Sequence, residues 1–396
     1  MALCHEWTIQ YAGSERVTAE IAKVIDPDSC YTAAVEGGTE RIVFGDRRIE
    51  TWSFGLRPRV RDNWPKLLPV LPLAWRGVDL GGHRLVVTSS HSCVNAVPAS
   101  PGSIRLSYSH TPMRYAWCWR EELRRVPRAL QPAWPAVAAA LRRADRGWSE
   151  RVDAFACNSA FVAERIARFY GREATVVPPP VDVDAFTPGD DPSPRDVFVV
   201  VGRLVSYKRV DVAIRAAARA GVDLVVVGDG IERSRLEAMA GPNVRFTGAV
   251  DQEALLGWYR RARALVIPGV EDFGIGPLEA QACGTPVLAR TEGGTSETVL
   301  DGTTGRLVAG EDVEAWADAL ASFDSARYAP AACRDNALRF SPDRFRSRFR
   351  AFVRQHAPDV ELPAEAEPAE AEPAPVPPIS GGAGYEDRSI RNDASL

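Results

Sequence analysis

The chain has 396 residues, enough for two domains that each bury a core of their own. With 45% apolar and 25% charged residues, its composition excludes a wholly disordered, collagen-like or coiled-coil chain. The net charge of −4 is unevenly spread, because residues 361–396 carry eight carboxylates against two arginines, which leaves +2 for residues 1–360. That small excess is far below the basic footprint of a nucleic-acid-binding protein.

The expected localisation and cysteine redox state follow from three features that the sequence lacks: a long apolar segment, a secretory signal and cysteines at metal-ligand spacing. No segment has the roughly 18 uninterrupted apolar residues that a membrane-spanning helix needs. Glu6 stands where a secretory signal would need an apolar run, so we expect a cytoplasmic protein. The seven cysteines are scattered and have no metal-ligand spacing, so we expect reduced and mostly buried thiols.

Short β-branched runs alternate with helical patterns in the first half, which is typical of parallel sheets with crossover helices. The clearest predicted elements are strands over 84–88, 104–108 and 154–157 and a helix over 159–170. Gly171 follows that helix where a left-handed cap is wanted. The proline-rich stretch 175–196 then predicts a stiff connector.

A second alternating series begins at once. Its predicted strands are 197–201, 224–227, 244–247, 264–267 and 286–289. The sequence therefore predicts two doubly wound domains, and such sheets bind ligands at the carboxyl ends of their strands. Phe345, Phe349 and Phe352 lie at helical spacing and predict a final amphipathic helix over 342–353. The Ala-Glu-Pro repeats and polar end within 361–396 predict a disordered acidic tail.

A pair of cations follows the first strand of the second domain. Arg203 and Lys208 lie five residues apart, after Gly202, where a strand ends and a helix begins, and they predict a cradle for an anion. Two solvated surface charges are the alternative. The turn at Gly228 and Asp229 lacks the third glycine of a dinucleotide fingerprint and by itself predicts only a tight turn. The chain also has no P-loop motif and no His-Glu-x-x-His motif.

The sharpest motif is the segment Glu271–Glu279, between a predicted strand and a helix that Pro277 starts and Gly284 ends. Gly274 and Gly276 let backbone amides approach a ligand at the start of this helix, where negative charge is favoured. The two glutamates can face one cleft from different heights. Carboxylates suit sugar hydroxyls and amides suit phosphate oxygens, so the motif predicts a site for a nucleotide diphosphate sugar. A solvated surface carboxylate is the alternative for each glutamate taken singly.

These motifs, together with the double-glycine segment 293–305, resemble those of the retaining glycosyltransferases of family 4, which have the GT-B architecture. Segments of the first half are similar to a bacterial subgroup of polysaccharide mannosyltransferases, whose usual donor is GDP-mannose. They are His5–Trp7, Gly13–Arg16, Ser89–His91, Ser107–Trp117 and Asn158–Ile166. The residues at 207–211, Tyr-Lys-Arg-Val-Asp, are also similar to those of that subgroup. The resemblance covers residues 3 to 350 and leaves out the tail.

The resemblance implies two Rossmann-like domains that face each other across a cleft, with a C-terminal helix that returns to the first domain. We expect an N-terminal acceptor-binding domain over 1–190, a nucleotide-sugar-binding domain over 195–340, the returning helix over 341–358 and the disordered tail over 361–396.

Roles are carried over position by position. Arg203 and Lys208 would neutralise the donor diphosphate in place of a metal, Glu271 would bind sugar hydroxyls, and His110 would lie near the donor sugar. Further donor contacts are expected from Gly13, Gly202, Gly228, Asp229, Phe273, Gly274, Ile275 and Glu279, the last on the ribose. No cofactor is expected beyond the nucleotide-sugar co-substrate. Asp182 and Asp184 stand in the connector and are expected to be structural rather than metal ligands.

The sequence indicates the acceptor-binding surface less clearly than the donor site. Arginines interleaved with aromatic residues in the first domain predict a headgroup or pyrophosphate-lipid surface and peripheral membrane contact; the arginines named for it are Arg57, Arg59, Arg61 and Arg114. An arginine-rich solvated face is the alternative. Two departures from the family stand nearby: Ala12-Gly13-Ser14-Glu15 replaces Gly-Gly-Ala-Glu, and Cys118 replaces an aspartate.

The sequence thus predicts a retaining, metal-independent hexosyltransferase, with GDP-mannose as the favoured donor and a lipid-linked saccharide, other glycan or small molecule as acceptor. A UDP-sugar-dependent enzyme acting on a natural product is the first alternative. A nucleotide-sugar epimerase, a sugar phosphorylase or a non-catalytic nucleotide-sugar-binding protein of the same fold remains open. Donor incubated alone separates an epimerase from a transferase, because an epimerase converts it without acceptor.

Overall fold

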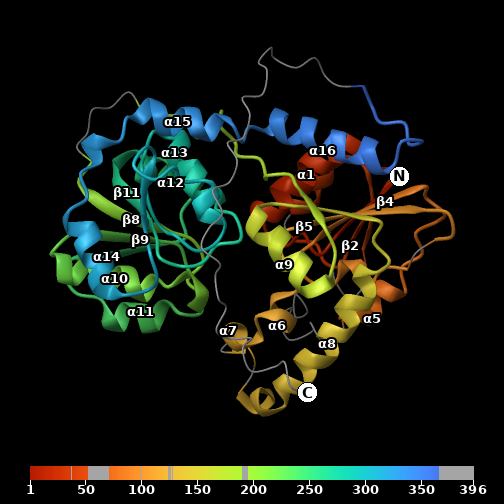
Figure 1. Ribbon diagram of the computed structural model, residues 1–396, viewed down its shortest axis with the longest axis horizontal. Helices are drawn as coiled ribbons and strands as arrows, with labels where there is room; N and C mark the ends of the chain where they lie inside the picture. The colour runs from red at the N-terminus through yellow and green to blue at the C-terminus, as the bar shows by residue number, and fades with distance from the viewer. Residues whose placement is uncertain are drawn as a thin grey trace. The chain divides into compact units, whose positions relative to one another are not determined.

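The computed structural model describes residues 1–36, 38–51, 71–98, 100–123, 126, 128–189 and 195–364. Arg57, Arg59, Arg61 and residues 365–396 of the predicted tail lie outside the described residues. Within the described chain there are two compact units (Figure 1): residues 1–180 with 342–364 form unit 1, and residues 181–341 form unit 2. Each unit has one parallel sheet covered by helices, which confirms the predicted α/β class with two doubly wound domains.

Unit 1 is built on a seven-stranded sheet with the order β3-β2-β1-β4-β5-β6-β7. Its strands are β1 Ala2–His5, β2 Ser29–Thr32, β3 Arg48–Thr51, β4 Leu85–Ser90, β5 Ile104–Ser109, β6 Ala154–Cys157 and β7 Ala174–Val176. Its helices are α1 Gly13–Ile25, α2 Thr39–Phe44, α5 Leu71–Arg76, α6 Arg114–Trp117, α7 Trp119–Glu122, α8 Trp134–Ser149, α9 Ala160–Tyr170 and α16 Pro342–His356. The fully buried β1 lies between β2 and β4, so it places its carboxyl end beside theirs.

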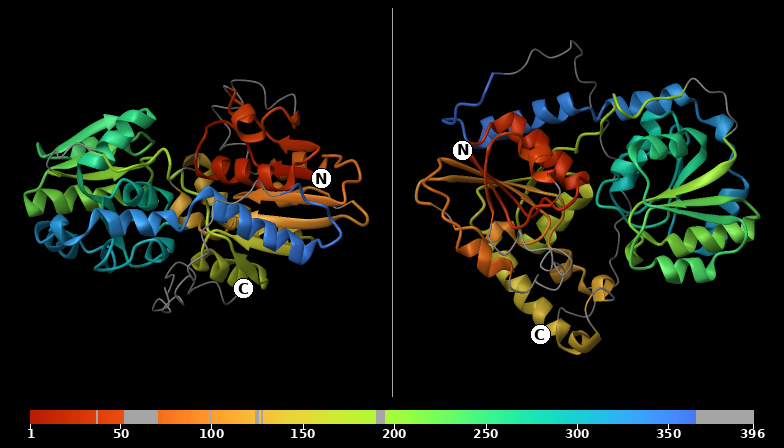
Figure 2. Two further views of the ribbon diagram at one scale, coloured as in Figure 1. Left: turned by 90° about the horizontal axis from the view of Figure 1, so that it is seen from above. Right: turned by 180° about the vertical axis from the view of Figure 1, so that it is seen from behind.

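The core of unit 1 joins segments from both ends of the chain. Phe345, Phe349 and Phe352 of α16 pack into the same apolar cluster as Val17 and Ile21 of α1. Both views of Figure 2 show α16 beside α1. The final amphipathic helix predicted from the phenylalanine spacing is therefore confirmed, and it extends to His356.

Unit 2 is built on a six-stranded sheet with the order β10-β9-β8-β11-β12-β13. Its strands are β8 Val197–Val201, β9 Leu224–Val227, β10 Val244–Gly248, β11 Ala262–Ile267, β12 Val287–Arg290 and β13 Gly305–Val308. Its helices are α10 Val210–Ala220, α11 Arg233–Met239, α12 Gln252–Arg261, α13 Ile275–Ala282, α14 Val313–Ala321 and α15 Pro330–Leu338.

The helices of unit 2 form a layer on each face of its sheet (Figure 1). Helix α10 packs against α14 on one face, and α13 packs against α15 on the other. Fully buried Trp316 belongs to the first layer and fully buried Tyr259 to the second. Because β8 pairs with β11, the loops that follow these two strands leave the same edge of the sheet side by side. Among the described residues, no helix is long and apolar enough to cross a membrane.

Candidate functional site

Two loops at the carboxyl edge of the unit 2 sheet bring Lys208 and Glu271 together. Lys208 ends a short 3₁₀ turn after β8, and Glu271 stands in the loop after β11. The Lys208 Nζ atom donates to Glu271 Oε1 at 2.5 Å. Burial by itself would lower the pKa of Lys208, but the adjacent Glu271 carboxylate raises it above the ordinary lysine value. Lys208 therefore remains a cation throughout the physiological pH range.

A pocket open to solvent surrounds this pair. It has about 250 Å³ of space, and Gly202, Arg203, Lys208 and Glu271 line it together with the ends of β8 and β11. Three of the four predicted catalytic residues thus share one pocket, with two cations beside one carboxylate. Such an arrangement suits a ligand that carries both negative charge and hydroxyl groups.

Glycines allow the loops around the pocket to pack backbone against backbone. A Cβ on Gly269 would lie 2.4 Å from the Tyr207 carbonyl oxygen, and one on Gly294 would lie 2.3 Å from the Asp272 carbonyl oxygen. The Gly294 amide also donates to the Glu271 carbonyl oxygen at 2.7 Å. The double-glycine segment after β12 is therefore a support for the loop that carries Glu271.

Helix α13 begins earlier than predicted. It starts at Ile275, with Gly274 as its N-cap at φ +111°, a conformation that glycine adopts readily. Pro277 lies inside the first turn, where a missing backbone N–H leaves no helical hydrogen bond unmade, so the prediction that Pro277 starts the helix was two residues late.

Glu279 lies on α13 and does not line the pocket with Glu271. The residue is 7% exposed, and the hydroxyl of Tyr259 on α12 donates to its Oε2 atom at 3.0 Å. Tyr259 was not singled out from the sequence, since an unremarkable helical tyrosine 20 residues upstream carries no motif. The predicted ribose contact of Glu279 remains a prediction.

The other predicted donor residues of unit 2 offer mainly backbone. The Phe273 ring packs against Phe340 with centroids 5.7 Å apart, and Ile275 packs on the same cluster. The backbone of Gly228 lies against that of Gly202. Asp229 turns toward α11, where it pairs with Arg233 at 3.0 Å.

In unit 1, His110 directly follows β5, is partly buried, and contacts a cluster of buried polar side chains. The Ser89 Oγ atom lies 2.8 Å from His110 Nε2 and 3.1 Å from His5 Nδ1. The Thr18 Oγ1 atom lies 2.7 Å from Ser89 Oγ. Burial, aided by the charge of His5, lowers the pKa of His110 to about 3. The His110 ring is therefore neutral at physiological pH and suits hydrogen bonding rather than ion pairing.

Gly13 is the first residue of α1, and Glu15 fixes this helix start. The Glu15 Oε2 atom accepts from the Ala12 amide at 3.2 Å and from Ser14 Oγ at 2.9 Å, while Oε1 lies 3.7 Å from His5 Nε2. Burial opposes ionisation, but the hydrogen bond and charge of His5 bring the pKa of Glu15 below its ordinary value. The Gly13 loop and the His110 cluster thus share His5.

Arg114, named for an acceptor or membrane surface, is ion-paired in unit 1, and its role at such a surface stays a prediction. Its guanidinium pairs with Glu121 and Glu122, each at 3.1 Å, because α7 supplies two carboxylates to it. Cys118, the residue in place of the family aspartate, has Arg165 Nη2 2.7 Å from its Sγ atom. Asp182 accepts from the Ala185 amide at 3.0 Å, which is a local turn contact. Among the described residues, no group of three or more His, Cys, Asp or Glu side chains could hold a metal ion.

Comparison with known proteins identifies the family of both halves. The model of Glycosyltransferase Family 4 matches residues 13–185, and that of Glycosyl transferases group 1 matches residues 186–340. The chain belongs to the GT-B glycosyltransferases of family 4 and group 1. The family named from the sequence is confirmed, whereas the polysaccharide mannosyltransferase subgroup stays a prediction.

Curated relatives match part of the chain. The D-inositol 3-phosphate glycosyltransferase of Mycolicibacterium paratuberculosis is 41% identical over 167 residues, which is 37% of this chain and 38% of the relative. D-inositol 3-phosphate glycosyltransferase 2 of Catenulispora acidiphila is 36% identical over 221 residues, 48% of this chain and 52% of the relative. The chain therefore spans about half or less of the length of these relatives.

Solved structures share the fold of the chain. Anabaena HepE, solved with UDP and glucose, has a TM-score of 0.67 at 15% identity and covers 89% of this chain and 98% of its own. Sucrose-phosphate synthase from Thermosynechococcus elongatus has a TM-score of 0.65 at 20% identity, with 90% and 99% covered. At these identities the likeness concerns the fold alone.

Proposed function

We propose that this glycosyltransferase moves a hexose from a nucleotide diphosphate sugar to a hydroxyl acceptor, with retention of configuration. The observation that carries the proposal is the Lys208–Glu271 pair beside Arg203 in the unit 2 pocket. A diphosphate is bound by cations, and the hydroxyl groups of a sugar donate hydrogen bonds to a carboxylate. The pocket offers two cations and one carboxylate.

The two cations would act mainly on the leaving group. As the bond from the sugar to the diphosphate breaks, negative charge builds on the phosphate oxygen, and Arg203 and Lys208 are fixed charges that stabilise it. Glu271 would orient the sugar through its hydroxyl groups. The acceptor would attack on the face that the diphosphate leaves, and the departing phosphate oxygen would take the acceptor proton. With two cations at the leaving group, this chemistry needs no metal ion.

Contacts from unit 1 are proposed for His110 and Gly13. A neutral His110 ring, with its Nε2 atom beside Ser89, would exchange a hydrogen bond with the donor sugar. The Gly13 amide, at the start of α1, would bind the diphosphate, since helix N-termini favour anions.

GDP-mannose remains the proposed donor, on the basis of the sequence motifs of the first half. UDP-sugars are the alternative, because HepE, which shares the fold, was solved with UDP. For the acceptor, the names of the curated relatives favour a phosphorylated inositol over a lipid-linked saccharide. The proposed acceptor class is therefore a hydroxyl of a small phosphorylated cyclitol.

The test is a thermal-shift and calorimetric panel of GDP, UDP, ADP and dTDP with their common sugars, in the presence of EDTA. A nucleotide that binds only the folded state raises its apparent stability. We expect one nucleotide family to stabilise the protein without metal, and Lys208→Ala to abolish that shift. Arg219→Ala is the matched control, because Arg219 is an exposed arginine paired with Glu314 on the same unit.

Two results would contradict the proposal. If no nucleotide stabilised the protein, the proposal of a transferase would be wrong. If the protein converted a nucleotide sugar without any acceptor, it would be an epimerase instead. Sugar transfer to D-inositol 3-phosphate but not to inositol would establish the phosphorylated acceptor class.

A further inference from the structure

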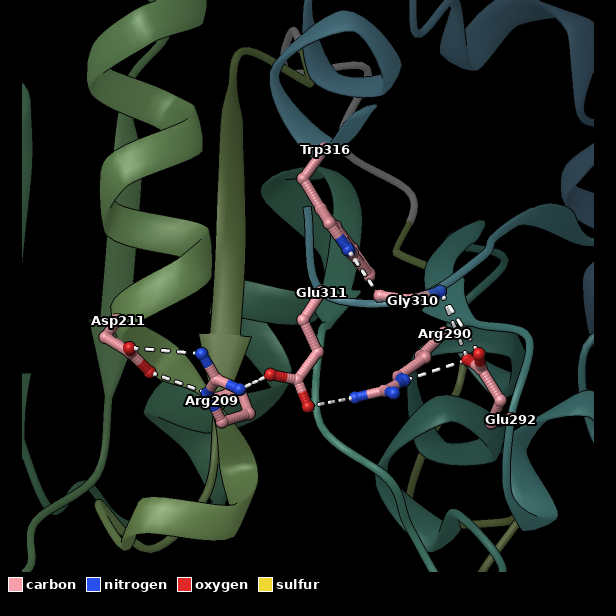
Figure 3. A network of polar contacts seen from close by, with 7 residues as sticks. All are labelled: Arg209, Asp211, Arg290, Glu292, Gly310, Glu311 and Trp316. Atoms are coloured by element: carbon pink, nitrogen blue, oxygen red, sulfur yellow. Dashed lines mark hydrogen bonds and ion pairs between the residues drawn. The ribbon is translucent and has the colours of Figure 1, made fainter. Parts of the chain in front are cut away.

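A chain of alternating charges links the segments that follow β8, β12 and β13 in unit 2 (Figure 3). Glu311, in the loop between β13 and α14, pairs with Arg209 through Oε2 and with Arg290 through Oε1, the latter at 2.7 Å. Arg209 also reaches Asp211 at 3.2 Å, and Arg290 reaches Glu292 at 2.8 Å. Glu311 therefore connects the segment after β8 to the end of β12.

The Arg290 end of this network is anchored in the unit. Arg290 is 6% exposed, so the carboxylates around it are needed to offset the free-energy cost of burying its charge. Burial opposes ionisation of Glu292, but Arg290 and the Gly310 amide hold the pKa of this carboxyl below its ordinary value. Buried Trp316 donates to the Gly310 carbonyl oxygen at 3.2 Å, which fixes the residue before Glu311 (Figure 3).

Arg209 has an unusual backbone conformation. Its φ of +51° makes it one of two non-glycine residues with positive φ in the described part of the chain. The left-handed region is unfavourable for a residue with a Cβ, and it persists where surrounding contacts impose it. Arg209 stands between the 3₁₀ turn that ends at Lys208 and the start of α10, so its conformation sets how the turn that carries Lys208 joins this helix.

We propose that Glu311 is a positioning residue for the donor pocket. It holds Arg209 in the left-handed conformation and thereby holds Lys208 against Glu271. Through Arg290, the same carboxylate fixes the start of the 291–297 loop, whose Gly294 amide supports Glu271. This inference rests on the proposed function of the pocket, but the placement of Lys208 can be measured without any donor.

The first test measures that placement directly. Lys208 is one of three lysines in the chain, so its acylation by acetic anhydride can be followed by peptide mass spectrometry, with Lys23 as the internal reference. We expect Glu311→Gln to accelerate acylation of Lys208 severalfold relative to Lys23, because a released amine is more exposed and less basic. Glu314→Gln is the matched control, since Glu314 pairs with Arg219 and also joins α14 to α10. Equal Lys208 rates in Glu311→Gln and the wild type would overturn the inference.

The second test separates positioning from general stability. We expect Glu311→Gln to lower kcat/KM for the donor roughly tenfold to a hundredfold, as small displacements of charged groups do, and Glu314→Gln to leave it unchanged. Arg209→Gly removes the side chain but adopts positive φ freely, so it should retain more activity than Arg209→Ala. In the Arg209→Gly background, Glu311→Gln should lose the part of its effect that acts through Arg209 and keep only the part that acts through Arg290.

The outcomes distinguish this inference from the proposed function. If Glu311→Gln lowers kcat/KM by the same factor in both backgrounds, or if Arg209→Gly is no better than Arg209→Ala, the positioning role is wrong. If the wild type transfers no sugar while acylation of Lys208 still responds to Glu311→Gln, the positioning role stands and the proposed function fails.

Discussion

The charge of Lys208 depends on its neighbour Glu271. Burial works against the ammonium ion, and the carboxylate overcomes that effect, so the raised pKa belongs to the pair rather than to the lysine. A cation that is buried and paired in this way is ready to meet a diphosphate without first taking up a proton.

Substitution of Glu271 by Gln tests this dependence. Without the carboxylate, burial lowers the pKa of Lys208, so the alkaline limb of the kcat/KM profile should move to lower pH. At neutral pH, kcat/KM should fall roughly tenfold to a hundredfold through the lost charged hydrogen bond. The measurement is kcat/KM for the donor between pH 7 and 10.5. Glu237→Gln, which removes a carboxylate paired with Arg233 on α11, is the control, and an unmoved alkaline limb would contradict the argument.

A second carboxylate, Glu6, follows β1 in unit 1 and is fully buried. Its Oε1 atom accepts from the amides of Ser92 and Val94, both at 2.8 Å. Burial raises its pKa to about 7, although these backbone amides act in the opposite direction. Glu6 therefore fixes the loop after β4 and links the stability of unit 1 to pH.

The direction of that linkage follows from the two states of the protein. Between pH 4.5 and 7 the folded state keeps a proton on Glu6 that the unfolded state has released, so this contribution to stability is present below pH 4.5 and lost as pH rises to 7. The difference in unfolding free energy between wild type and Glu6→Gln should fall by about 3 kcal/mol over that range. Denaturant unfolding at several pH values measures it. Glu150→Gln, at an exposed position, is the control, and a difference for Glu6→Gln that does not change with pH would contradict the linkage.

At the scale of elements, the loops after β8, β11 and β12 form one packed set. Gly269 and Gly294 are the points of closest approach, and each would bring a Cβ within 2.4 Å of a backbone oxygen. A side chain at either point would move a loop rather than only a neighbouring side chain.

Gly294→Ala should therefore destabilise the protein by roughly 1–3 kcal/mol and lower kcat/KM, because the loop that carries Glu271 must shift. Gly257→Ala is the matched control: Gly257 lies within α12, and nothing stands within 4 Å of its added Cβ. That change should stabilise the helix by roughly 0.5–1 kcal/mol. Urea unfolding and donor kinetics of both variants test the contrast, which fails if the two alanines behave alike.

Prediction from sequence worked best where a strand is a short, unbroken run of apolar residues. Strands 154–157, 197–201 and 224–227 were predicted with the bounds that the structure has. The sequence analysis did not single out β1, β2, β3, β7 or β13, and it assigned residues 175 and 176 of β7 to the connector. They are short, β3 is polar, and β1 is recognised as a strand mainly because it lies between β2 and β4.

The candidate site was predicted in its residue types but not in its pairings. The Lys208–Glu271 contact joins residues 63 apart, and it depends on β8 lying beside β11, which no local pattern encodes. Tyr259 beside Glu279 and Ser89 beside His110 were missed for the same reason: each contact exists only after sheets and helices have assembled.

For the whole molecule, the proposed donor site places nucleotide binding in unit 2. Hydrogen exchange with the nucleotide that binds should slow at 202–209, 269–275 and 291–297, while the amides of α8 in unit 1 stay unchanged. Mass spectrometry of peptides with and without nucleotide measures this. Protection confined to unit 1 would contradict the assignment of the pocket.

The chain passes from unit 1 to unit 2 near residue 180 and returns near residue 342 to supply α16. On the ribosome, all of unit 2 is consequently synthesised while the core of unit 1 still lacks Phe345, Phe349 and Phe352. Unit 2 can close its own core first, whereas the first-made half keeps an apolar face of α1 uncovered until the last helix emerges. The synthesis of unit 1 thus begins first, but its core is completed last. Every residue added to the chain between α1 and α16 lengthens the time for which the apolar face of α1 is exposed.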